Sequence, residues 1–201
     1  MDKRYINISK AVSYALRHNP SAFGLELDSE GWVSAGDLIN ALNKHNKSLD
    51  VTVASLCYII DNSDKKRFEI RDNMIRATYG HSIENKIEYT PQTPPVVLYH
   101  GTTHKAYPKI AGLFGEGLKP MERQYVHLSS DIKTAITVGK RRDPNPIMFA
   151  INAMLMYDDG IKFYHTGNDT TWLCDSVPKH YIINEHEASD LLGKDGEDNA
   201  Q

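Results

Sequence analysis

The chain has 201 residues, of which 40% are hydrophobic, and its formal net charge is −3. A chain of this length can bury one large core or two small ones. Residues 185–201 hold six acidic residues and one lysine, which leaves 22 basic and 20 acidic residues in positions 1–184. This balance excludes a general polyanion-binding protein, so any contact with nucleic acid must come from locally placed arginines.

Cys57 and Cys174 lie far apart in the sequence and form no metal-ligand pattern. This usage favours a reduced, intracellular protein over a disulfide scaffold. The first ten residues lack the apolar core of a signal peptide, and no apolar run approaches membrane-spanning length. We therefore expect a cytoplasmic protein that makes no contact with membranes.

The first third of the chain predicts helices followed by a β-hairpin. Apolar residues recur at helical spacing from Ile8 to Leu16, and Pro20 ends that helix just after an Arg-His pair. The segment GLELDSEGWVS (24–34) predicts a strand, a turn and a strand. Ser34 is expected to cap a helix over 35–44 with Asp37 as its capping-box partner. A further helix is expected over 52–61, and then a hairpin of RFEI (67–70) and MIRAT (74–78).

The hairpin decides where one arginine points. Side chains alternate between the two faces of a strand, so Arg76 must face away from the core if Ile75 and Ala77 are buried. A solvated surface arginine is the plain alternative to a ligand-binding role. Helices followed by a hairpin are typical of a winged-helix lobe, in which the wing often contacts nucleic acid.

The segment YTPQTPPV (89–96) holds three prolines and is the clearest linker. Beyond it the pattern becomes rich in strands. A first strand over 96–99 ends in His-Gly-Thr, and a helix capped by Ser130 is expected over 131–138. The other elements predicted here are a helix over 105–114 and strands over 125–128, 147–151, 161–164, 171–173 and 181–184. The acidic segment 185–201 is expected to be partly disordered.

Several common chemistries are not indicated. The glycines of GLFGEG (112–117) have the wrong spacing for a dinucleotide fingerprint, and no GxxxxGK[ST] phosphate loop occurs. No zinc-deaminase pattern is present. The run Glu185-His186-Glu187 is more typical of a solvated surface than of a metal site, so we expect no metal.

Four segments carry most of the chemical information: SYALRHNP (13–20), IRATYGHS (75–82), LYHGTT (98–103) and RQYVHLSS (123–130). Each places an arginine or a histidine near the end of a helix or strand. Arginine matches phosphate oxygens, and histidine exchanges protons near neutral pH. Two arginine-bearing segments in the first half and two histidine-bearing segments in the second predict one anionic site built from two lobes.

In their order and spacing these segments resemble the NAD-dependent RNA 2′-phosphotransferase family. The likeness runs from about Ile8 to Tyr181, and it includes GWV (31–33) and the AxxVGKR pattern that ends at Arg141. The resemblance implies an α+β chain with a winged-helix-like, RNA-phosphate-binding lobe over 1–92. An ADP-ribosyltransferase-like, NAD-binding lobe would occupy 93–184, and an acidic tail would follow over 185–201.

The resemblance also implies a two-step reaction in which NAD is consumed. In the first step the RNA 2′-phosphate attacks the anomeric carbon of the nicotinamide ribose and nicotinamide leaves. In the second step the 2″-hydroxyl of that ribose attacks phosphorus, which yields RNA with a 2′-hydroxyl and ADP-ribose 1″,2″-cyclic phosphate. The partner would be an RNA with an internal 2′-phosphate, including transfer RNA during splicing and processing. We expect a monomer.

Matching the family motifs assigns roles to residues of this chain. The catalytic set around the 2′-phosphate would be Arg17, His18, Arg76 and Arg123. Three of the four carry charge that does not titrate near neutral pH, and only His18 can exchange a proton there. His81 and Ser82 match the GHS segment and would bind substrate or orient Arg76.

The second lobe would hold NAD. Its cofactor-binding residues would be His100, Gly101, Thr102, His127, Ser129 and Arg141. Gly101 would permit close approach of the backbone to the nicotinamide side, and His100 would donate to ribose or pyrophosphate oxygens. Without the resemblance, either histidine would be interpreted as an ordinary core or loop residue, and Arg141 as a solvated helix end.

Two departures from the family pattern stand out. Tyr79 occupies a position where many relatives have glutamine, and GLFGEGL (112–118) holds more glycine than expected, which predicts a longer or mobile loop. Two alternative functions share the same residues. One is an ADP-ribosyltransferase that modifies terminal phosphates of nucleic acid and stops after the first step. The other is a non-catalytic RNA-binding protein with a degenerate second lobe.

Overall fold

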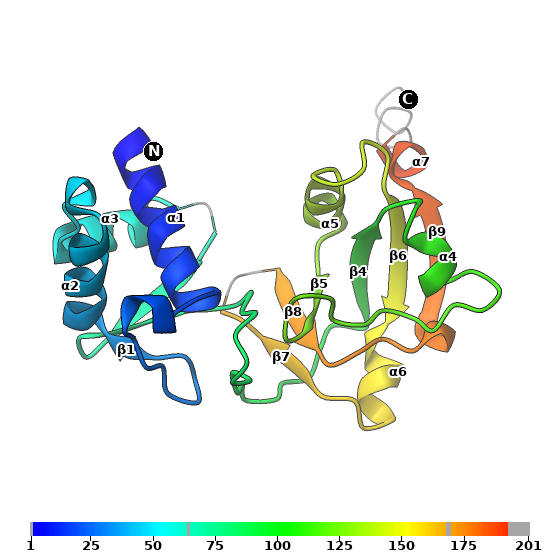
Figure 1. The fold of residues 1–201 in the computed structure, drawn as a ribbon. Coiled ribbons are helices and arrows are strands. Elements are labelled where there is room, and N and C mark those ends of the chain that lie inside the picture. The colour runs from blue at the N-terminus through cyan, green and yellow to red at the C-terminus, as the bar shows by residue number, and fades with distance from the viewer. Residues whose placement is uncertain (1, 64, 168–169, 193–201) are drawn as a thin grey trace, which may run out of the picture. The chain divides into compact units, whose positions relative to one another are not determined.

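The computed structural model describes residues 2–63, 65–167 and 170–192. Contacts divide the chain into two units (Figure 1). Unit 1 comprises Met1–Tyr89 together with Glu122–Gln124, and unit 2 comprises Thr90–Met121 and the chain from Tyr125 onward. The first boundary lies three residues before the predicted division at 92/93, and a three-residue segment from the second half of the sequence packs with the first unit.

Unit 1 combines three helices with a small antiparallel sheet of order β1-β3-β2. Its α-helices are α1 (Lys3–Arg17), α2 (Ala35–His45) and α3 (Val53–Asp61), and its strands are β1 (Val33–Ser34), β2 (Phe68–Arg71) and β3 (Met74–Ala77). Two short 3-10 helices, η1 (Ser21–Phe23) and η2 (Lys47–Leu49), connect them. The apolar stripe of α1 is fully buried, as its spacing predicts, and packs in one core with Leu38, Leu56 and Ile75. Burial of this stripe holds the C-terminal end of α1, with its Arg-His pair, against the sheet.

Local chemistry explains where the elements of unit 1 begin and end. The Ser34 hydroxyl accepts from the Asp37 N–H at 3.2 Å and caps α2 as predicted, whereas the reciprocal capping box forms at α3, between Thr52 and Ser55. Of the strand, turn and strand predicted over 24–34, the turn and the second strand are confirmed, and the first strand does not form. The Asp28 carboxylate accepts from the backbone N–H of Trp32 at 2.8 Å, so this segment is a side-chain-stabilised turn and the strand starts at Val33.

The β2–β3 hairpin is confirmed, with Asp72 and Asn73 at its tip in left-handed backbone geometry. Its register places Ile75 opposite Ile70 and Arg76 opposite Glu69. Ile75 and Ala77 are buried. Arg76 therefore lies on the opposite face, as the strand alternation predicts.

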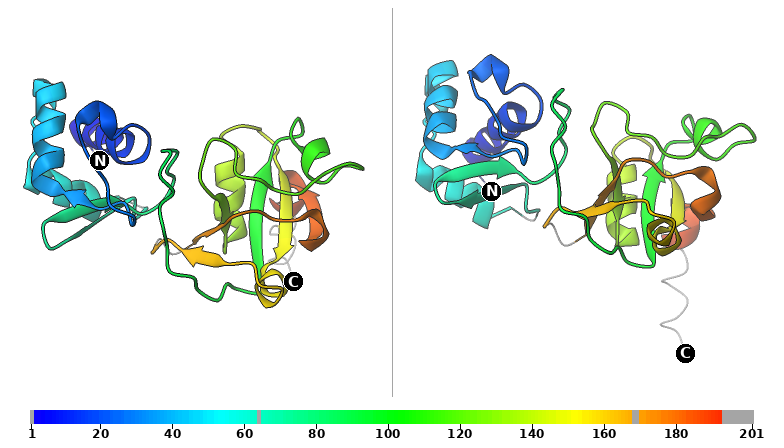
Figure 2. Two further views of the ribbon diagram at one scale, coloured as in Figure 1. Left: turned by 60° about the horizontal axis from the view of Figure 1, so that its bottom comes forward. Right: turned by 90° about the horizontal axis from the view of Figure 1, so that it is seen from below.

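Unit 2 is an antiparallel sheet of order β7-β8-β5-β4-β6-β9 (Figure 1). Its strands are β4 (Val97–Thr102), β5 (Val126–Ser129), β6 (Ile147–Asn152), β7 (Phe163–His165), β8 (Thr171–Cys174) and β9 (Ile182–Glu187). Its helices are α4 (Tyr107–Ile110), α5 (Ile132–Gly139), α6 (Ala153–Asp158), η3 (Lys179–Tyr181) and α7 (Ala188–Leu192). Figure 2 shows α5 lying against β4 in both views. The main core of this unit includes Leu98, Leu128 and Phe149, and α5 and α7 form a smaller cluster around Met148.

Two sequence expectations in unit 2 are corrected, one helix was not predicted, and the expectation for the acidic tail is tested only in part. Asp131, and not Ser130, caps α5, because its carboxylate accepts from the Thr134 N–H at 2.7 Å. The helix expected over 105–114 shrinks to α4, with glycines following it. The helix α6 was not predicted. Part of the expected acidic tail is regular, because β9 extends to Glu187 and α7 follows, and the rest of that prediction, 193–201, lies outside the described residues.

The coarse prediction of a mixed helix and strand fold is therefore confirmed, with two antiparallel sheets. The likenesses to a winged helix and to an ADP-ribosyltransferase stay predictions. No helix among the described residues has the length and apolar character needed to cross a membrane.

Candidate functional site

Arg17, the last residue of α1, places its guanidinium near two aromatic rings. Its guanidinium carbon lies 4.9 Å from the centre of the Tyr79 ring and 5.8 Å from that of Phe68, and Nη2 donates to the Arg67 carbonyl at 3.3 Å. Burial lowers the pKa of Arg17 to about 10, so the group stays charged at neutral pH. Within the described residues its buried Nε has no hydrogen-bond partner. A buried cation with an unused donor is suited to an anion that brings its own oxygens.

His18 follows Arg17 and ends α1. Its Nδ1 lies 2.8 Å from the Ser82 hydroxyl, and the Ser82 N–H donates to the Arg17 carbonyl at 2.9 Å. Burial lowers the pKa of His18, and the charges of Arg17 and Arg123 lower it further. The imidazole is therefore neutral near pH 7 and able to accept a proton.

Arg123 is positioned by Gln124, the residue that follows it, whose hydrogen bonds attach this part of the chain to unit 1. The Gln124 amide donates to the carbonyls of Ile83 and Asn85 at 2.8 Å each, and its oxygen accepts from the Ile87 N–H at 3.0 Å. The Gln124 N–H also donates to the His81 carbonyl at 3.1 Å. These bonds anchor the neighbouring Arg123 in unit 1, where its charge lowers the pKa values of Arg17 and His18.

Arg76 is held by carboxylates in this structure. Its Nε and Nη2 lie 3.0 and 2.9 Å from Oε2 of Glu69, and Nη1 lies 3.2 Å from Oε2 of Glu30. The guanidinium carbon stacks 4.5 Å from the ring centre of Trp32. The carboxylates and the indole fix the plane of the guanidinium, and the carboxylates also neutralise part of its charge.

His81 lies beneath these cations and is only 3% exposed. Burial lowers its pKa to about 3, and the charges of Arg17, His18 and Arg76 contribute in the same direction. Its Nδ1 lies 3.3 Å from the Tyr89 hydroxyl, and its buried Nε2 has no partner in the described part of the chain. The His81 ring is therefore a neutral, buried group that packs near the charged residues. The neighbouring Ser82 is exposed.

The six residues predicted for the phosphate lobe therefore gather in unit 1. Arg17, His18 and Ser82 are joined by direct contacts, and the charges of Arg17 and Arg76 both act on His81 and Tyr89. Sequence reasoning missed Gln124, Tyr89 and Glu69. Gln124 could not be found from a local pattern, because its partners lie 37 to 41 residues away. Glu69 lies opposite Arg76 in the β2–β3 hairpin, so the register of that hairpin is the signal that could have found it.

In unit 2, the HGT and VHLS segments lie on the neighbouring strands β4 and β5. In the described residues the register between these strands joins one pair, Tyr99 and Ser129, whereas β4 pairs with β6 along all six of its residues. Beyond that pair the described residues of β4 and β5 are not paired, and the His100 side chain links the two strands. Its Nδ1 donates to the His127 carbonyl at 2.9 Å.

This bond determines what His100 can do. Burial lowers its pKa, so the ring is neutral, and the proton lies on Nδ1 because the His127 carbonyl needs a donor. The other nitrogen, Nε2, is then an acceptor. It suits a ribose hydroxyl better than a pyrophosphate oxygen, which differs from the donor role expected from the sequence.

The other predicted cofactor residues are placed by packing. A Cβ built on Gly101 would meet the Ala135 carbonyl oxygen at 3.0 Å and the Gly139 Cα at 3.2 Å, so this glycine allows α5 to pack closely on β4. Thr102 and Ser129 are buried. The Ser129 hydroxyl donates to the Asp131 carbonyl at 2.8 Å and accepts from the Asp131 N–H at 3.1 Å, which shapes the turn into α5.

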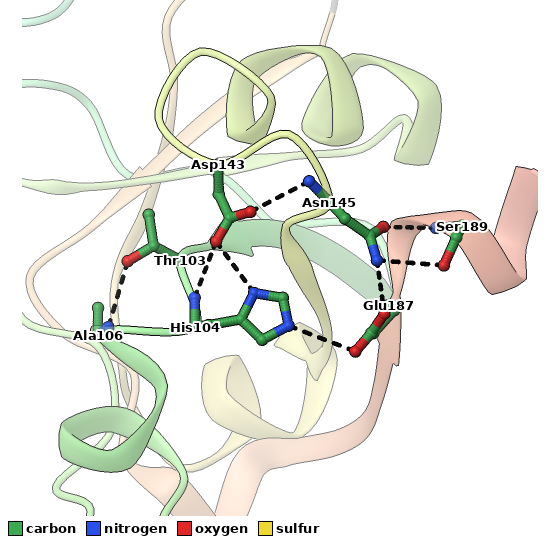
Figure 3. A network of polar contacts seen from close by, with 7 residues as sticks. All are labelled: Thr103, His104, Ala106, Asp143, Asn145, Glu187 and Ser189. Atoms are coloured by element: carbon green, nitrogen blue, oxygen red, sulfur yellow. Dashed lines mark hydrogen bonds and ion pairs between the residues drawn. The ribbon is translucent and has the colours of Figure 1, made fainter.

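His127 lies between Tyr125 and Ser129 on β5, with its Nδ1 3.0 Å from the Tyr125 carbonyl oxygen. Arg141 is exposed in the loop that follows α5. A polar network at the end of β4 fixes that loop (Figure 3). Both the N–H and Nδ1 of His104 lie 3.0 Å from Oδ2 of Asp143.

The same network continues to the edge of the sheet. Nε2 of His104 lies 3.3 Å from Oε1 of Glu187 on β9, and the Asn145 amide donates to Glu187 and to the Ser189 hydroxyl (Figure 3). Hydrogen bonds to Asp143 and Glu187 raise the pKa of His104. Among residues 2–63, 65–167 and 170–192, no group of three or more histidine, cysteine, aspartate or glutamate side chains is arranged to hold a metal ion.

Comparison with known proteins gives one consistent result. A family model described as RNA 2′-phosphotransferase, Tpt1/KptA family, matches residues 3–176. A probable RNA 2′-phosphotransferase of Acetivibrio thermocellus is 48% identical over 178 residues, which cover 89% of this chain and 96% of the relative. Another from Bacillus thuringiensis subsp. konkukian is 47% identical over 180 residues, covering 90% and 95%. One from Flavobacterium johnsoniae is 43% identical over 178 residues, covering 88% and 94%.

Proposed function

Because the chain belongs to the RNA 2′-phosphotransferase family, we propose that it removes an internal 2′-phosphate from RNA with NAD as the co-substrate. The observation that carries this proposal is the cationic cluster of unit 1. The charges of Arg17 and Arg76 act on His81, which burial keeps neutral at physiological pH, and the charge of Arg123 acts on Arg17 and His18.

A 2′-phosphomonoester is nearly a dianion at neutral pH and lies beside a charged diester. Binding it requires cations that do not titrate, and guanidinium groups meet this requirement. The unused Nε donor of Arg17 and the exposed His18 and Ser82 are the groups we assign to the phosphate oxygens. Glu69 and Glu30 are assigned to hold the Arg76 guanidinium in a fixed plane before the substrate arrives.

The residues of unit 2 fit a dinucleotide. The opening between β4 and β5 leaves strand edges near His100 and His127, and Nε2 of His100 is an acceptor for a ribose hydroxyl. NAD would supply an anomeric carbon that becomes electrophilic as nicotinamide leaves. The network of His104, Asp143 and Glu187 holds the loop that carries Arg141, which we assign to the same ligand.

The two steps place different demands on these residues. In the first step the phosphate is already a nucleophile, so the arginines need only to align it. In the second step a ribose hydroxyl must lose a proton while charge shifts among phosphoryl oxygens. His18 is neutral near pH 7, so it can accept that proton, while the arginines stabilise the charge.

The test measures nicotinamide release and the products made from labelled RNA. We expect nicotinamide only when NAD and a 2′-phosphorylated oligonucleotide are both present, with 2′-hydroxyl RNA and a cyclic phosphate as products. Folded protein that releases no nicotinamide under these conditions contradicts the proposal. A stable ADP-ribosylated RNA from the wild-type protein would instead identify an ADP-ribosyltransferase that stops after the first step.

A further inference from the structure

The glycine-rich segment after α4 is an ordered loop. The Gly115 N–H donates to the Gly112 carbonyl at 2.8 Å, the Glu116 N–H to the Lys109 carbonyl at 3.1 Å, and the Gly117 N–H to the Ile110 carbonyl at 3.0 Å. Leu118 then pairs with Val177. Figure 1 and both views of Figure 2 show this loop projecting beside α4 from the body of unit 2. These contacts give the loop a defined turn, and the expectation that it is longer or mobile stays a prediction.

Its three glycines are required by this shape. A Cβ on Gly112 would lie 2.5 Å from the Pro108 carbonyl oxygen, one on Gly115 would lie 2.4 Å from that of Ile110, and one on Gly117 would lie 2.0 Å from that of Val177. These contacts are all with backbone atoms, so no side-chain movement can relieve them. The chain folds back tightly on itself, and the side chains between the glycines point outward.

The outward side chains are Leu113 and Phe114, which are 87% and 89% exposed. Two adjacent large apolar side chains at this exposure gain almost nothing from burial, although each could gain about 1.5–3 kcal/mol if it were covered. Single exposed apolar residues are ordinary, but a pair held outward by a constrained turn is typical of an interaction surface.

The charge around the tip indicates the partner. The loop and the residues that hold it carry Lys109, Lys119 and Lys179 against Glu116, and Glu185 accepts a hydrogen bond from Tyr107 of α4 at 2.7 Å, which leaves a net charge of +1. Lys119 pairs with Glu116, and the Lys179 ammonium donates to the Gly112 carbonyl at 2.6 Å. An aromatic ring with a net positive surround matches a single-stranded nucleic acid, whose bases stack and whose phosphates are anionic.

We propose that the Leu113–Phe114 tip is a stacking platform for unpaired bases of the RNA substrate. The inference rests on the proposed function, which makes RNA the partner. A base that stacks on the tip would belong to the nucleotides that flank the 2′-phosphate, so the contact requires an RNA longer than a dinucleotide.

The experiment compares the wild-type protein with Phe114→Ala in binding to 2′-phosphorylated RNAs of two and of about ten nucleotides. One stacked base is worth about tenfold in affinity. We expect Phe114→Ala to weaken binding of the longer RNA about tenfold, to raise its KM, and to leave kcat and the binding of the dinucleotide unchanged. Tyr157→Ala, which removes a 37% exposed aromatic ring from α6, is the matched control and should change neither.

A second variant reports on the contact directly. In Phe114→Trp the added indole should be quenched by the longer RNA, beyond any change seen in the wild-type protein with its own two tryptophans. Equal RNA binding by wild type and Phe114→Ala, with unquenched fluorescence in Phe114→Trp, overturns the proposal. That result would assign the tip to a different kind of partner.

Unphosphorylated ten-nucleotide RNA separates this inference from the proposed function. If the wild-type protein releases no nicotinamide but its binding to this RNA still depends on Phe114, the proposed reaction fails and the platform stands. If nicotinamide is released and binding of neither RNA depends on Phe114, the platform fails and the reaction stands.

Discussion

The candidate site residues of the two units differ in the charge that they carry. Unit 1 buries permanent charge, as seen in Arg17, whose guanidinium stacks on two aromatic rings and whose buried Nε has no hydrogen-bond partner among the described residues. Unit 2 presents neutral hydrogen-bonding groups, such as His100 bridging two strands that separate. Permanent cations suit a phosphate dianion, and neutral acceptors suit the hydroxyl groups of a ribose. In the proposed reaction, this contrast assigns the phosphate to unit 1 and the ribose to unit 2.

The largest effect is expected from removing charge in unit 1. Arg123→Ala should lower the rate of the second step about 10²–10³-fold, since it removes a cation from phosphoryl oxygens whose charge shifts in that step. The first step should suffer less, so labelled ADP-ribosylated RNA should accumulate. Product separation over time measures both steps.

Arg4→Ala is the matched control for that change. Arg4 forms an exposed ion pair with Asp50 at 2.9 Å and lies outside the cluster, so both steps should continue at the wild-type rate. If Arg123→Ala slows the two steps equally and no intermediate appears, the assignment of the arginine to the second step is wrong.

The next effect concerns the neutral scaffold of unit 2. Gly101→Ala should lower the free energy of unfolding by about 1–3 kcal/mol, because the new Cβ presses on backbone atoms of α5 at Ala135 and Gly139. Thermal unfolding measures the change. Gly36→Ala in α2 is the control, since its Cβ would meet only Ser34 Oγ at an ordinary 3.5 Å, and it should be neutral or slightly stabilising. An unchanged melting temperature for Gly101→Ala would refute the close packing of β4 on α5.

The residues in these two predictions also show which features could be predicted from the sequence. Periodicity located α1 and the β2–β3 hairpin, and strand alternation placed Arg76 on the face opposite Ile75. Family motifs named Arg123, but nothing local in the sequence shows that Gln124 fastens it to the segment around Ile83. That bond joins positions 41 residues apart, and residue spacing carries no signal for it.

The sequence was least informative where a side chain competes with a regular element or where packing decides a role. The Asp28 carboxylate stabilises the turn that was predicted within 24–34, but the strand predicted before that turn does not form. Gly101 was interpreted as space for a ligand, whereas α5 fills the space beside it. The glycines after α4 predicted a longer or mobile loop, but the sequence did not show that each one lies against a backbone carbonyl oxygen in a defined turn.

A smaller effect is expected from the neutral histidine among the cations of unit 1. The pKa of His81 is lowered to about 3, so the unfolded chain binds a proton below its ordinary pKa of about 6.5 that the folded chain does not. Stability should therefore fall as the pH drops from 6.5 toward 3, and at pH 5 the loss should be about 2 kcal/mol. Urea unfolding of the wild type and His81→Gln across this range measures it. If the two proteins lose stability in parallel, His81 is not the group responsible.

The smallest effect is expected from His104. Unlike the neutral His100, this histidine of unit 2 lies in surroundings that favour its charged form. Asp143 and Glu187 face its two nitrogens and raise its pKa (Figure 3). Its contribution to stability should be complete below about pH 6.5, the ordinary value, and should be lost as the pH rises through the raised pKa. The melting temperature of His104→Gln should therefore lie below that of the wild type at pH 6 and match it at pH 9.

Asp143→Asn and the double variant complete that comparison. Because Asp143 bonds both the backbone and the ring of His104, the two single changes should not add in the double variant at pH 6. High salt should shrink the differences, since the network is exposed and screened. Additive effects, or a difference that persists unchanged at pH 9, would mean that this network stabilises unit 2 through shape alone and that the charge on His104 plays no part.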